Sequence, residues 1–361
     1  MGPPGAVVPL GLLGLADPPR AEVKVALEHV HAAGIRPLVM TGDNHQTALA
    51  IGLEVGLRPE EVHARMTPAD KFEMVRELVA AGEVVAMTGD GVNDAPAVRE
   101  AHIGIAMGLR GTEVTRSAAD MVLVKDDYGS IVAAVEEGRA IYANIRKAVV
   151  YLLAGNLGEL TVVMVALLAG LPIPLLPVQL LWINLVTDGL PALALVKDPK
   201  LPDQMLRPPR PSGEPILGVP QWTRVVGIAG LDAIVVLSIY AWALPDTEVA
   251  RTLAFTTLAA SQMFRALTAR SDDQPLWRLP PNPRLVAVVA VTLLLQVGVL
   301  MVPWTRDLLQ VEALAPILVL TALGLGAVPA MVLTILAAVR GRERHARRRA
   351  HDARDAPPPI P

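Results

Sequence analysis

The chain contains no cysteine in its 361 residues, which excludes disulfide bonds, thiolate metal sites and catalysis by cysteine. It also has little net charge, formally −3 at pH 7, so no overall positive field points to nucleic acid as a partner. The first residues have no basic start and are interrupted by prolines, so we expect no signal peptide there. Apolar residues, by contrast, make up 52% of the chain, and the mean hydropathy of +0.44 is too high for an ordinary soluble protein.

Charge is distributed unevenly and divides the chain into two parts. Residues 1–146 carry many charges, whereas long apolar stretches dominate from about residue 147 onward. A membrane-spanning helix needs roughly 20 mostly apolar residues. The fourth candidate span is the weakest because it contains Gln262 and Arg265, and we expect Arg265 to extend its charged end to the cytoplasmic surface. The six candidates are residues 147–171, 175–196, 221–244, 250–269, 284–303 and 313–339.

The basic residues between the predicted spans indicate the orientation of the chain. The tail after residue 339 is rich in arginine and proline, and the connections at 197–220 and 270–283 also carry Lys or Arg. With six spans these segments fall on one side of the membrane, which the positive-inside rule identifies as the cytoplasm. We therefore predict a multi-pass membrane protein whose head domain and both termini are cytoplasmic. The Ala-, Arg- and Pro-rich composition favours a prokaryotic plasma membrane.

The charged part alternates short apolar runs with helical patterns. The runs at 10–17, 36–43, 83–90 and 119–127 are typical of buried strands, and the helical patterns lie between them. This alternation predicts a doubly wound α/β domain with a parallel sheet, in which ligands bind at the carboxyl ends of the strands.

Two of these strands end in the same phrase, Met-Thr-Gly-Asp, at residues 40–43 and 87–90. Glycine lets the backbone turn sharply there, and carboxylates at such ends suit Mg²⁺, which often bridges to a phosphate. Lys71 opens a helix after Thr67 and could hold a phosphate as a point charge. The pattern predicts a magnesium and phosphate site.

Polar residues inside the predicted spans indicate an ion pathway, because such groups are costly in a membrane. Asn156 and Glu159 share one helix face in the first span, and Asn184, Thr187 and Asp188 share one face in the second. Their carboxylate, amide and hydroxyl oxygens suit Ca²⁺, and Mn²⁺ stays open because it takes the same ligands. We expect Gly189 and Pro191 to interrupt the second helix.

Several motifs together resemble the P-type cation-transporting ATPases, whose catalytic domain has a haloacid-dehalogenase-like fold. The matching motifs are MTGDN at 40–44, ARMTPADK at 64–71, TGDGVNDAP at 88–96, GIAMG at 104–108 and EEGRAIYANIRK at 136–147. The stretch PVQLLWINLVTDGLPALAL at 177–195 is similar to the sixth membrane helix of sarcoplasmic-reticulum-type calcium pumps.

The resemblance implies a domain organisation and a role for each matched residue. Residues 1–135 would be part of the phosphorylation domain, 136–146 a stalk helix, 147–339 six membrane helices and 340–361 a basic, Pro-rich tail. Asp90 would bind Mg²⁺, Lys71 would neutralise the phosphorylated aspartate, and ATP would act with the domains that the chain lacks. The other implied roles are the phosphate and metal shell (Asn93, Asp94, Thr41, Gly42 and Asp43), the nucleotide contacts (Asp17 and Arg20) and the transported Ca²⁺ (Asn156, Glu159, Asn184, Thr187 and Asp188).

The chain departs from the family's pattern in two ways. It has no DKTGT motif, the site of the phosphorylated aspartate, and it lacks the actuator and nucleotide-binding domains and the first four membrane helices. We therefore expect no ATP hydrolysis by this chain alone, and the implied partner is the missing N-terminal part of the pump. In addition, Gln262 stands where reticulum-type pumps have a further Glu ligand, which leaves one or two ions per cycle open.

Two other functions fit parts of the sequence. The chain could be a remnant of a pump that acts as a non-catalytic ion-binding or regulatory membrane protein. A membrane-tethered phosphatase of the same fold group is a weaker alternative, because it needs an aspartate nucleophile with a second Asp two residues later at the end of an early strand, and the chain has no such pair. Asp232, in the middle of the third span, has no role that the resemblance implies.

Overall fold

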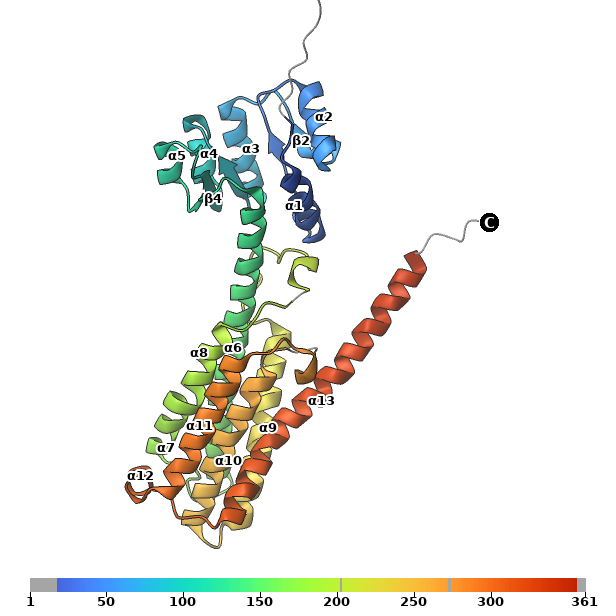
Figure 1. Ribbon diagram of the computed structural model, residues 1–361. Coiled ribbons are helices and arrows are strands. Elements are labelled where there is room, and N and C mark those ends of the chain that lie inside the picture. The colour runs from blue at the N-terminus through green and yellow to red at the C-terminus, as the bar shows by residue number, and fades with distance from the viewer. Residues whose placement is uncertain (1–17, 202, 272–273, 356–361) are drawn as a thin grey trace, which may run out of the picture. The chain divides into compact units, whose positions relative to one another are not determined.

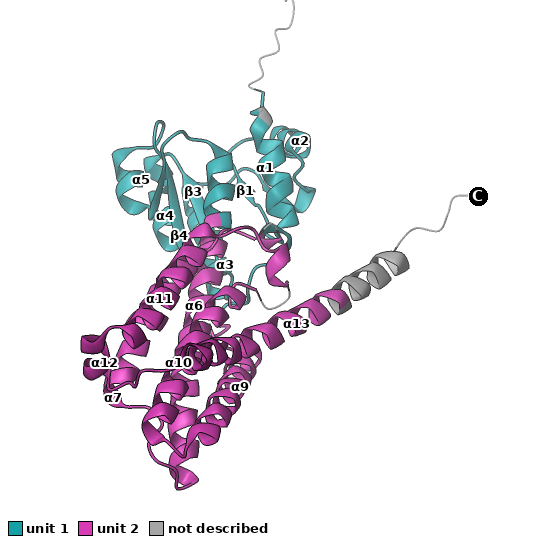
Figure 2. Cartoon of the chain, turned by 60° about the horizontal axis from the view of Figure 1, so that its bottom comes forward, with its two compact units in different colours: residues 1–136, 205–212 teal, residues 137–204, 213–361 magenta. Residues whose placement is uncertain are grey.

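The computed structural model describes residues 18–355 apart from 202 and 272–273, without the side chains of 343–355. The chain forms two compact units (Figure 2). Unit 1 comprises residues up to 136 together with 205–212, and unit 2 comprises 137–204 and the residues from 213 onward. The strand expected at 10–17 lies outside the described residues, as does Asp17.

Unit 1 contains the parallel strands that the sequence predicts, in two separate sheets. In the first sheet, β1 (Val39–Met40) pairs with β2 (Val62–His63). In the second, β3 (Ala86–Gly89) pairs with β4 (Ile103–Met107), which pairs with β5 (Met121–Leu123). Parallel pairing is confirmed. Strands β2 and β4 were not among the predicted strands, because two residues and a Gly-containing five-residue run give little periodic signal.

The helices of unit 1 begin where the sequence places capping residues. Asn44 accepts a hydrogen bond from the backbone N–H of Gln46 at the start of α2, and Thr67 and Asp70 form a reciprocal capping box at the start of α3. These caps orient the segments that follow the two sheets. The helices are α1 (Ala21–Ala32), α2 (His45–Val55), α3 (Pro68–Ala80), α4 (Ala95–Glu100) and α5 (Glu113–Ala118).

Each sheet of unit 1 has an edge strand at either end, and β1 and β3 are two of these edge strands. Among the described residues, β1 pairs only with β2, and β3 pairs only with β4. The side chain of Met40 in β1 nevertheless packs against the cluster that contains Met87 of β3 and Val75 of α3. Both Thr-Gly-Asp turns therefore follow strands that have a free edge.

Unit 2 is a bundle of long helices. Its first helix, α6, is a single helix of 41 residues that starts in unit 1. Within the described residues, five helical segments are long and apolar enough to cross a membrane: Tyr128–Leu168, Pro177–Val196, Val219–Ala243, Pro283–Met301 and Pro316–Arg342. The elements of the bundle are α6 (Tyr128–Leu168), α7 (Pro177–Trp182), a π-helical turn (Ile183–Asp188), α8 (Gly189–Val196), α9 (Val219–Ala243), α10 (Thr247–Thr268), α11 (Pro283–Met301), α12 (Pro303–Leu309) and α13 (Pro316–Asp355).

Helix α10 matches the fourth predicted span but is not among those five, because its sequence is too polar. It is nevertheless the most buried helix of the bundle and runs between α9 and α11 (Figure 1), and it also packs against α13. The contact between α10 and α13 is close because Gly326 of α13 has no side chain. A Cβ at that position would lie 2.6 Å from Cβ of Ala260 in α10. A helix enclosed by other helices can carry polar residues because they face protein rather than lipid.

Asp126 organises the loop that follows β4 in unit 1. It adopts a left-handed backbone conformation (φ 49°), which Asp tolerates better than most residues. Its carboxylate accepts hydrogen bonds from the backbone N–H groups of Gly108, Leu109 and Arg110 at 2.6, 3.0 and 2.8 Å. Burial raises the pKa of Asp126, but these N–H groups and the charge of Arg110 lower it by more, so the pKa lies below its ordinary value.

We predict that Asp126→Asn destabilises unit 1 at neutral pH and makes its unfolding less sensitive to acid. Because the folded-state pKa is depressed, the carboxylate stabilises the fold above the ordinary Asp pKa of about 3.9, and this contribution disappears as the pH falls through the folded value. Thermal unfolding of the detergent-solubilised chain between pH 3 and 7 measures this. Glu54→Gln, an exposed carboxylate in the same unit, is the control. Equal pH dependence of the Asp126→Asn variant and the unmodified protein would contradict the prediction.

Candidate functional site

The first Thr-Gly-Asp turn is held by its own side chains. The Thr41 hydroxyl donates to Oδ2 of Asp43 at 2.9 Å, and the backbone N–H of Asp43 donates to Thr41 Oγ1 at 3.1 Å. Gly42 and Asp43 are exposed, just ahead of the Asn44 cap of α2. The turn therefore presents exposed polar groups beside the N-terminus of a helix, where anions are stabilised.

The second turn lies at the end of β3 and carries the acidic residues of the GDGVND motif. Asp90 and Asn93 are exposed, whereas Asp94 is half-buried and forms an ion pair with Lys71, Nζ to Oδ1 at 2.9 Å. The turn depends on Gly89, because a Cβ there would lie 2.6 Å from Cβ of Asp94. The structure thus brings Lys71 of α3 to the turn after β3 and leaves the Asp90 carboxylate open to solvent.

The predicted nucleotide contacts are not assembled in the described part of the chain. The guanidinium of Arg20 donates to the backbone carbonyl of Asp126 at 2.7 Å, and its proposed companion Asp17 lies outside the described residues. No group of three His, Asp or Glu side chains in the described range is placed to hold a metal ion. A metal at Asp90 would therefore need ligands in addition to the protein carboxylates, such as a phosphate.

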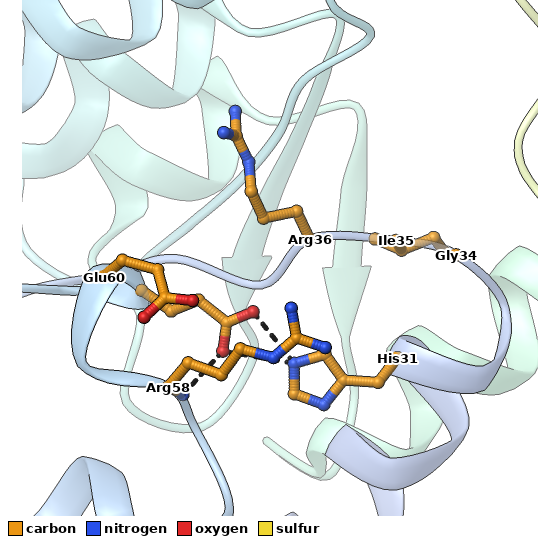
Figure 3. A pocket seen from close by; sticks show the side chains of 7 residues that line it. His31, Gly34, Ile35, Arg36, Arg58 and Glu60 are labelled. Carbon is orange, nitrogen blue, oxygen red and sulfur yellow. Dashed lines mark hydrogen bonds and ion pairs between the residues drawn. The ribbon is translucent and has the colours of Figure 1, made fainter.

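A pocket elsewhere in unit 1 contains none of the predicted site residues (Figure 3). His31, Arg36 and Arg58 lie around it, and Nε2 of His31 is 3.0 Å from Oε1 of the buried Glu61. Burial raises the pKa of Glu61, but the backbone N–H of Arg58 and the side chain of His31 lower it by more, so the net shift is downward. These contacts tie the end of α1 to the 3-10 turn Pro59–Glu61, just before β2, and account for the buried carboxylate structurally.

In unit 2, Asn184, Thr187 and Gln262 gather around Glu159. This buried carboxylate of α6 accepts hydrogen bonds from Nδ2 of Asn184 at 3.3 Å and from Nε2 of Gln262 at 2.9 Å. Thr187 joins the group, since its hydroxyl lies 3.2 Å from Oε1 of Gln262. Residues from α6, the π-helical turn and α10 therefore form one buried polar cluster.

The π-helical turn places the ligand candidates of the second span. Asn184, Thr187 and Asp188 all lie in the turn Ile183–Asp188, and π-helical turns of this kind are frequent at functional sites. The chain continues into α8 without a break, so the interruption expected at Gly189 and Pro191 takes the form of a widened turn just before them. Asp188 is buried, and its Oδ1 lies 3.3 Å from the Tyr151 hydroxyl.

Asn156 behaves differently from the other ligand candidates. It is exposed on α6, and its side chain has no hydrogen-bond partner in the described part of the chain. Asn184 is also largely exposed, although it reaches Glu159. The cluster is therefore closed toward α10 and open along the face of α6 that carries Asn156.

Two charged residues of this region were not assigned to the site from the sequence. Arg265 does not extend to the cytoplasmic surface, as we had expected. It is 1% exposed in the bundle, where Nη1 donates to the backbone carbonyl of Tyr151 at 2.9 Å. Its Nε lies 3.5 Å from Oδ2 of Asp232, which is fully buried on α9. A charge in the middle of a predicted span was the only sequence signal for this pair.

Comparison with known proteins finds related sequences for both units of the chain. A family model described as cation transporting ATPase, C-terminus, matches residues 172–339, and one described as haloacid dehalogenase-like hydrolase matches residues 6–102. The chain is 37% identical over 356 residues to a calcium-transporting ATPase of Bacillus subtilis, an alignment that covers 90% of the chain and 40% of that protein. It is 36% identical to calcium-transporting ATPase 1 of Yarrowia lipolytica, over 86% of the chain and 37% of that protein.

The chain belongs to the cation-transporting ATPases. It spans about two fifths of the length of the curated relatives it matches. A further relative, named "Probable cation-transporting ATPase F", from Mycobacterium tuberculosis, is 40% identical over 76% of the chain and 34% of its own length. The matched models account for both units: a haloacid-dehalogenase-like domain fragment and a multi-pass membrane bundle. The family in general uses ATP and Mg²⁺.

Gly155 determines how closely α6 approaches the buried charges of this ATPase bundle. A Cβ at this position would lie 2.7 Å from Oδ2 of Asp188 and 3.2 Å from Nη2 of Arg265. Both side chains are fully enclosed and have little room to move. We predict that Gly155→Val destabilises the bundle by about 1–3 kcal/mol, the usual cost of overpacking.

Thermal unfolding in detergent measures this effect. Gly138→Val is the matched control on the same helix, because a Cβ at Gly138 meets nothing within 4 Å. Equal melting temperatures for the two variants would show that α6 does not need the close approach at Gly155.

Proposed function

We propose that this chain is the C-terminal portion of an ATP-driven calcium pump. The buried cluster around Glu159 is the observation that carries the proposal, because it joins a carboxylate, two amides and a hydroxyl from three elements inside a membrane bundle. Two of the relatives are named calcium-transporting ATPases, which favours Ca²⁺ over other hard cations. The absence of cysteine disfavours soft metals as cargo.

The transported ion would bind where Glu159, Asn184, Thr187 and Gln262 converge. Asp188 would supply the second negative charge of the site. In the present arrangement the amide nitrogens of Asn184 and Gln262 face Glu159. Ion entry would turn both amides so that their oxygens point inward, which the broad terminal torsions of Asn and Gln permit. Asn156 would join from its exposed position on α6. Mn²⁺, which takes the same oxygen ligands, is the competing cargo.

In unit 1 the proposal assigns the phosphoryl-transfer chemistry to the two Thr-Gly-Asp turns. Mg²⁺ would be held by Asp90, with Asn93 and Asp94 supporting the shell, and would neutralise charge on a bound phosphate. Lys71 is already oriented by Asp94 at 2.9 Å and would add a positive charge to the same point. Thr41, Gly42 and Asp43 would contact the phosphate from the other turn, and Asp17 and Arg20 would lie nearer the nucleotide.

The phosphorylated aspartate would come from the rest of the pump. The free edges of β1 and β3 support this assignment, because each of these strands ends in Thr-Gly-Asp and, within the described part of the chain, pairs on one side only. A parallel strand paired to both edges would bring its own carboxyl end between the two turns, where an aspartate could receive a phosphoryl group. The missing N-terminal part of the pump is therefore the proposed partner of this unit.

The proposal also covers the arrangement in the membrane. We infer six membrane helices, with α10 as the fourth of them, a head domain within residues 1–135, a stalk at 136–146 and a cytoplasmic tail at 340–361. The membrane would be a prokaryotic plasma membrane, with the head domain and both termini on the cytoplasmic side. Enclosure of α10 by α9, α11 and α13 supports its crossing despite its polar sequence.

The lack of native cysteine makes the topology directly testable. If α10 crosses the membrane, Glu248→Cys near its start and Arg278→Cys beyond its end lie on opposite sides. Membrane-impermeant maleimide added to intact cells should then label the position 248 variant and leave the position 278 variant unlabelled until the cells are opened. Both positions are exposed, so burial does not limit labelling. Labelling of both variants from outside would contradict the six-helix arrangement.

The function itself is testable in a chimera. The chain is fused behind the N-terminal portion of the Bacillus subtilis relative that it does not match, and the fusion is reconstituted in vesicles. We expect Ca²⁺-dependent phosphorylation by ATP and ATP-driven uptake of ⁴⁵Ca²⁺. Glu159→Gln should lower the apparent Ca²⁺ affinity by at least about 10-fold, as loss of a metal-site group does. Glu248→Gln, an exposed glutamate on α10, should have no effect.

Two outcomes separate the alternatives. Phosphorylation and uptake that respond to Mn²⁺ and not to Ca²⁺ would reassign the cargo. A chimera that binds Ca²⁺ but shows neither phosphorylation nor uptake would identify the chain as an ion-binding remnant. A phosphatase role would require the unfused chain to hydrolyse p-nitrophenyl phosphate.

A further inference from the structure

A buried arginine lies beside the proposed ion site and is not accounted for by the calcium ligands. Arg265 is 1% exposed in the middle of the bundle, and Asp232 and Asp188 nearby are 0% and 1% exposed. Charges at such depth are costly unless they are paired, so an arginine there needs a specific reason. The inference below rests on the proposed function.

Arg265 is held in place from three directions. Nη1 donates to the Tyr151 carbonyl at 2.9 Å, and the guanidinium carbon lies 4.9 Å from the centre of the Tyr151 ring, a cation–π distance. On the far side, Nε faces Oδ2 of Asp232 at 3.5 Å, while Oδ1 of Asp232 accepts a hydrogen bond from Ser261 at 2.6 Å. Arg265 therefore has a fixed position and Asp232 is anchored as its partner.

Two further polar atoms of this group lie next to Gly155 of α6, beside Gln262 of the proposed ion site. Nη2 of Arg265 and Oδ2 of Asp188 have no hydrogen-bond partner in the described structure, although both are buried. Both atoms border the same point on α6, the place where a Cβ of Gly155 would be, and Nε2 of Gln262 lies beside them at 3.4 Å from that point. The guanidinium of Arg265 thus lies next to Asp188, a carboxylate that would also bind the calcium ion.

The charges of the whole cluster sum to −2, which one divalent cation neutralises. Glu159, Asp188 and Asp232 contribute three negative charges when ionised, and Arg265 contributes one positive charge, which leaves −2. A second Ca²⁺ would bring these four charged side chains to a net +2. Gln262, neutral and hydrogen-bonded to Glu159, adds no charge.

We propose that Arg265 is a built-in counterion that takes the place of a second calcium ion, with Asp232 and Ser261 as the residues that position it. The cluster then holds one divalent cation per chain, at Glu159 and the face of Asp188 that is not directed at Arg265. Asp232 thereby acquires a role: its charge prevents Arg265 from repelling the transported ion.

Equilibrium binding of ⁴⁵Ca²⁺ to the purified full chain in nanodiscs tests this. The unmodified chain should bind one Ca²⁺, and Arg265→Met, which removes the positive charge, should bind two. Arg265→Lys, which keeps the charge, should return the number to one. Asp232→Asn leaves Arg265 uncompensated and should weaken binding by about 10-fold or more. Arg251→Met, the same substitution at the exposed end of α10, is the matched control and should bind one Ca²⁺ with unchanged affinity.

The double variant Arg265→Met with Asp232→Asn distinguishes charge from packing. It restores the net charge of −2, so it should bind one Ca²⁺ again if Arg265 acts as a counterion. Two ions bound by the unmodified chain, or one ion bound by Arg265→Met with unchanged affinity, would overturn the counterion inference and leave calcium transport standing. Absence of saturable Ca²⁺ binding to the unmodified chain would overturn the counterion inference, whereas calcium transport is decided separately by the chimera. Thermal unfolding of each variant in the same nanodiscs identifies any variant that has lost its fold, and Arg265→Lys then carries the test.

Discussion

Most features of the membrane unit depend on one constraint: charged groups inside a helix bundle must be partnered there. Glu159, Asp188, Asp232 and Arg265 are all buried, and water does not reach them as it would at a surface. Each therefore requires polar neighbours from a different helix. This requirement explains why α10, which is too polar to be among the five candidate spans, is also the most enclosed helix. Its Ser261 and Arg265 partner Asp232 on α9, and its Gln262 partners Glu159 on α6.

The same constraint shapes the backbone around the cluster. A regular α-helix would present Asn184, Thr187 and Asp188 along a narrower arc, whereas the π-helical turn widens the helix where these side chains leave it. On the opposite side, α6 can approach Asp188 and Arg265 closely because Gly155 has no side chain. The exposed Asn156 and Asn184 show the one direction in which the cluster remains open. In unit 1, Lys71 and Asp94 satisfy each other in a similar way at the end of β3.

The local elements of unit 1 could be predicted well because their signals are local. The caps at Asn44 and Thr67 and the apolar run before Thr88 are contained within a few residues, so their helices and strand appear near the expected positions. Strands β2 and β4 were missed because their identity depends on pairing with distant segments. The depth of Arg265 was misjudged for the same reason: an arginine in a polar helix reads as a surface residue until the helices that enclose it are known.

The sequence by itself determined the family, the division into a charged and an apolar part, and the residue types of both candidate sites. Those properties follow from motifs and composition, which do not change when the chain folds. Only the tertiary structure decided which side chains meet: that Lys71 joins Asp94, that Glu159 is bonded by amides from two other elements, and that Arg265 faces Asp232 and Asp188 across three helices. These contacts connect residues 23 to 103 positions apart, and pairing over such separations is set by packing, which no short pattern encodes.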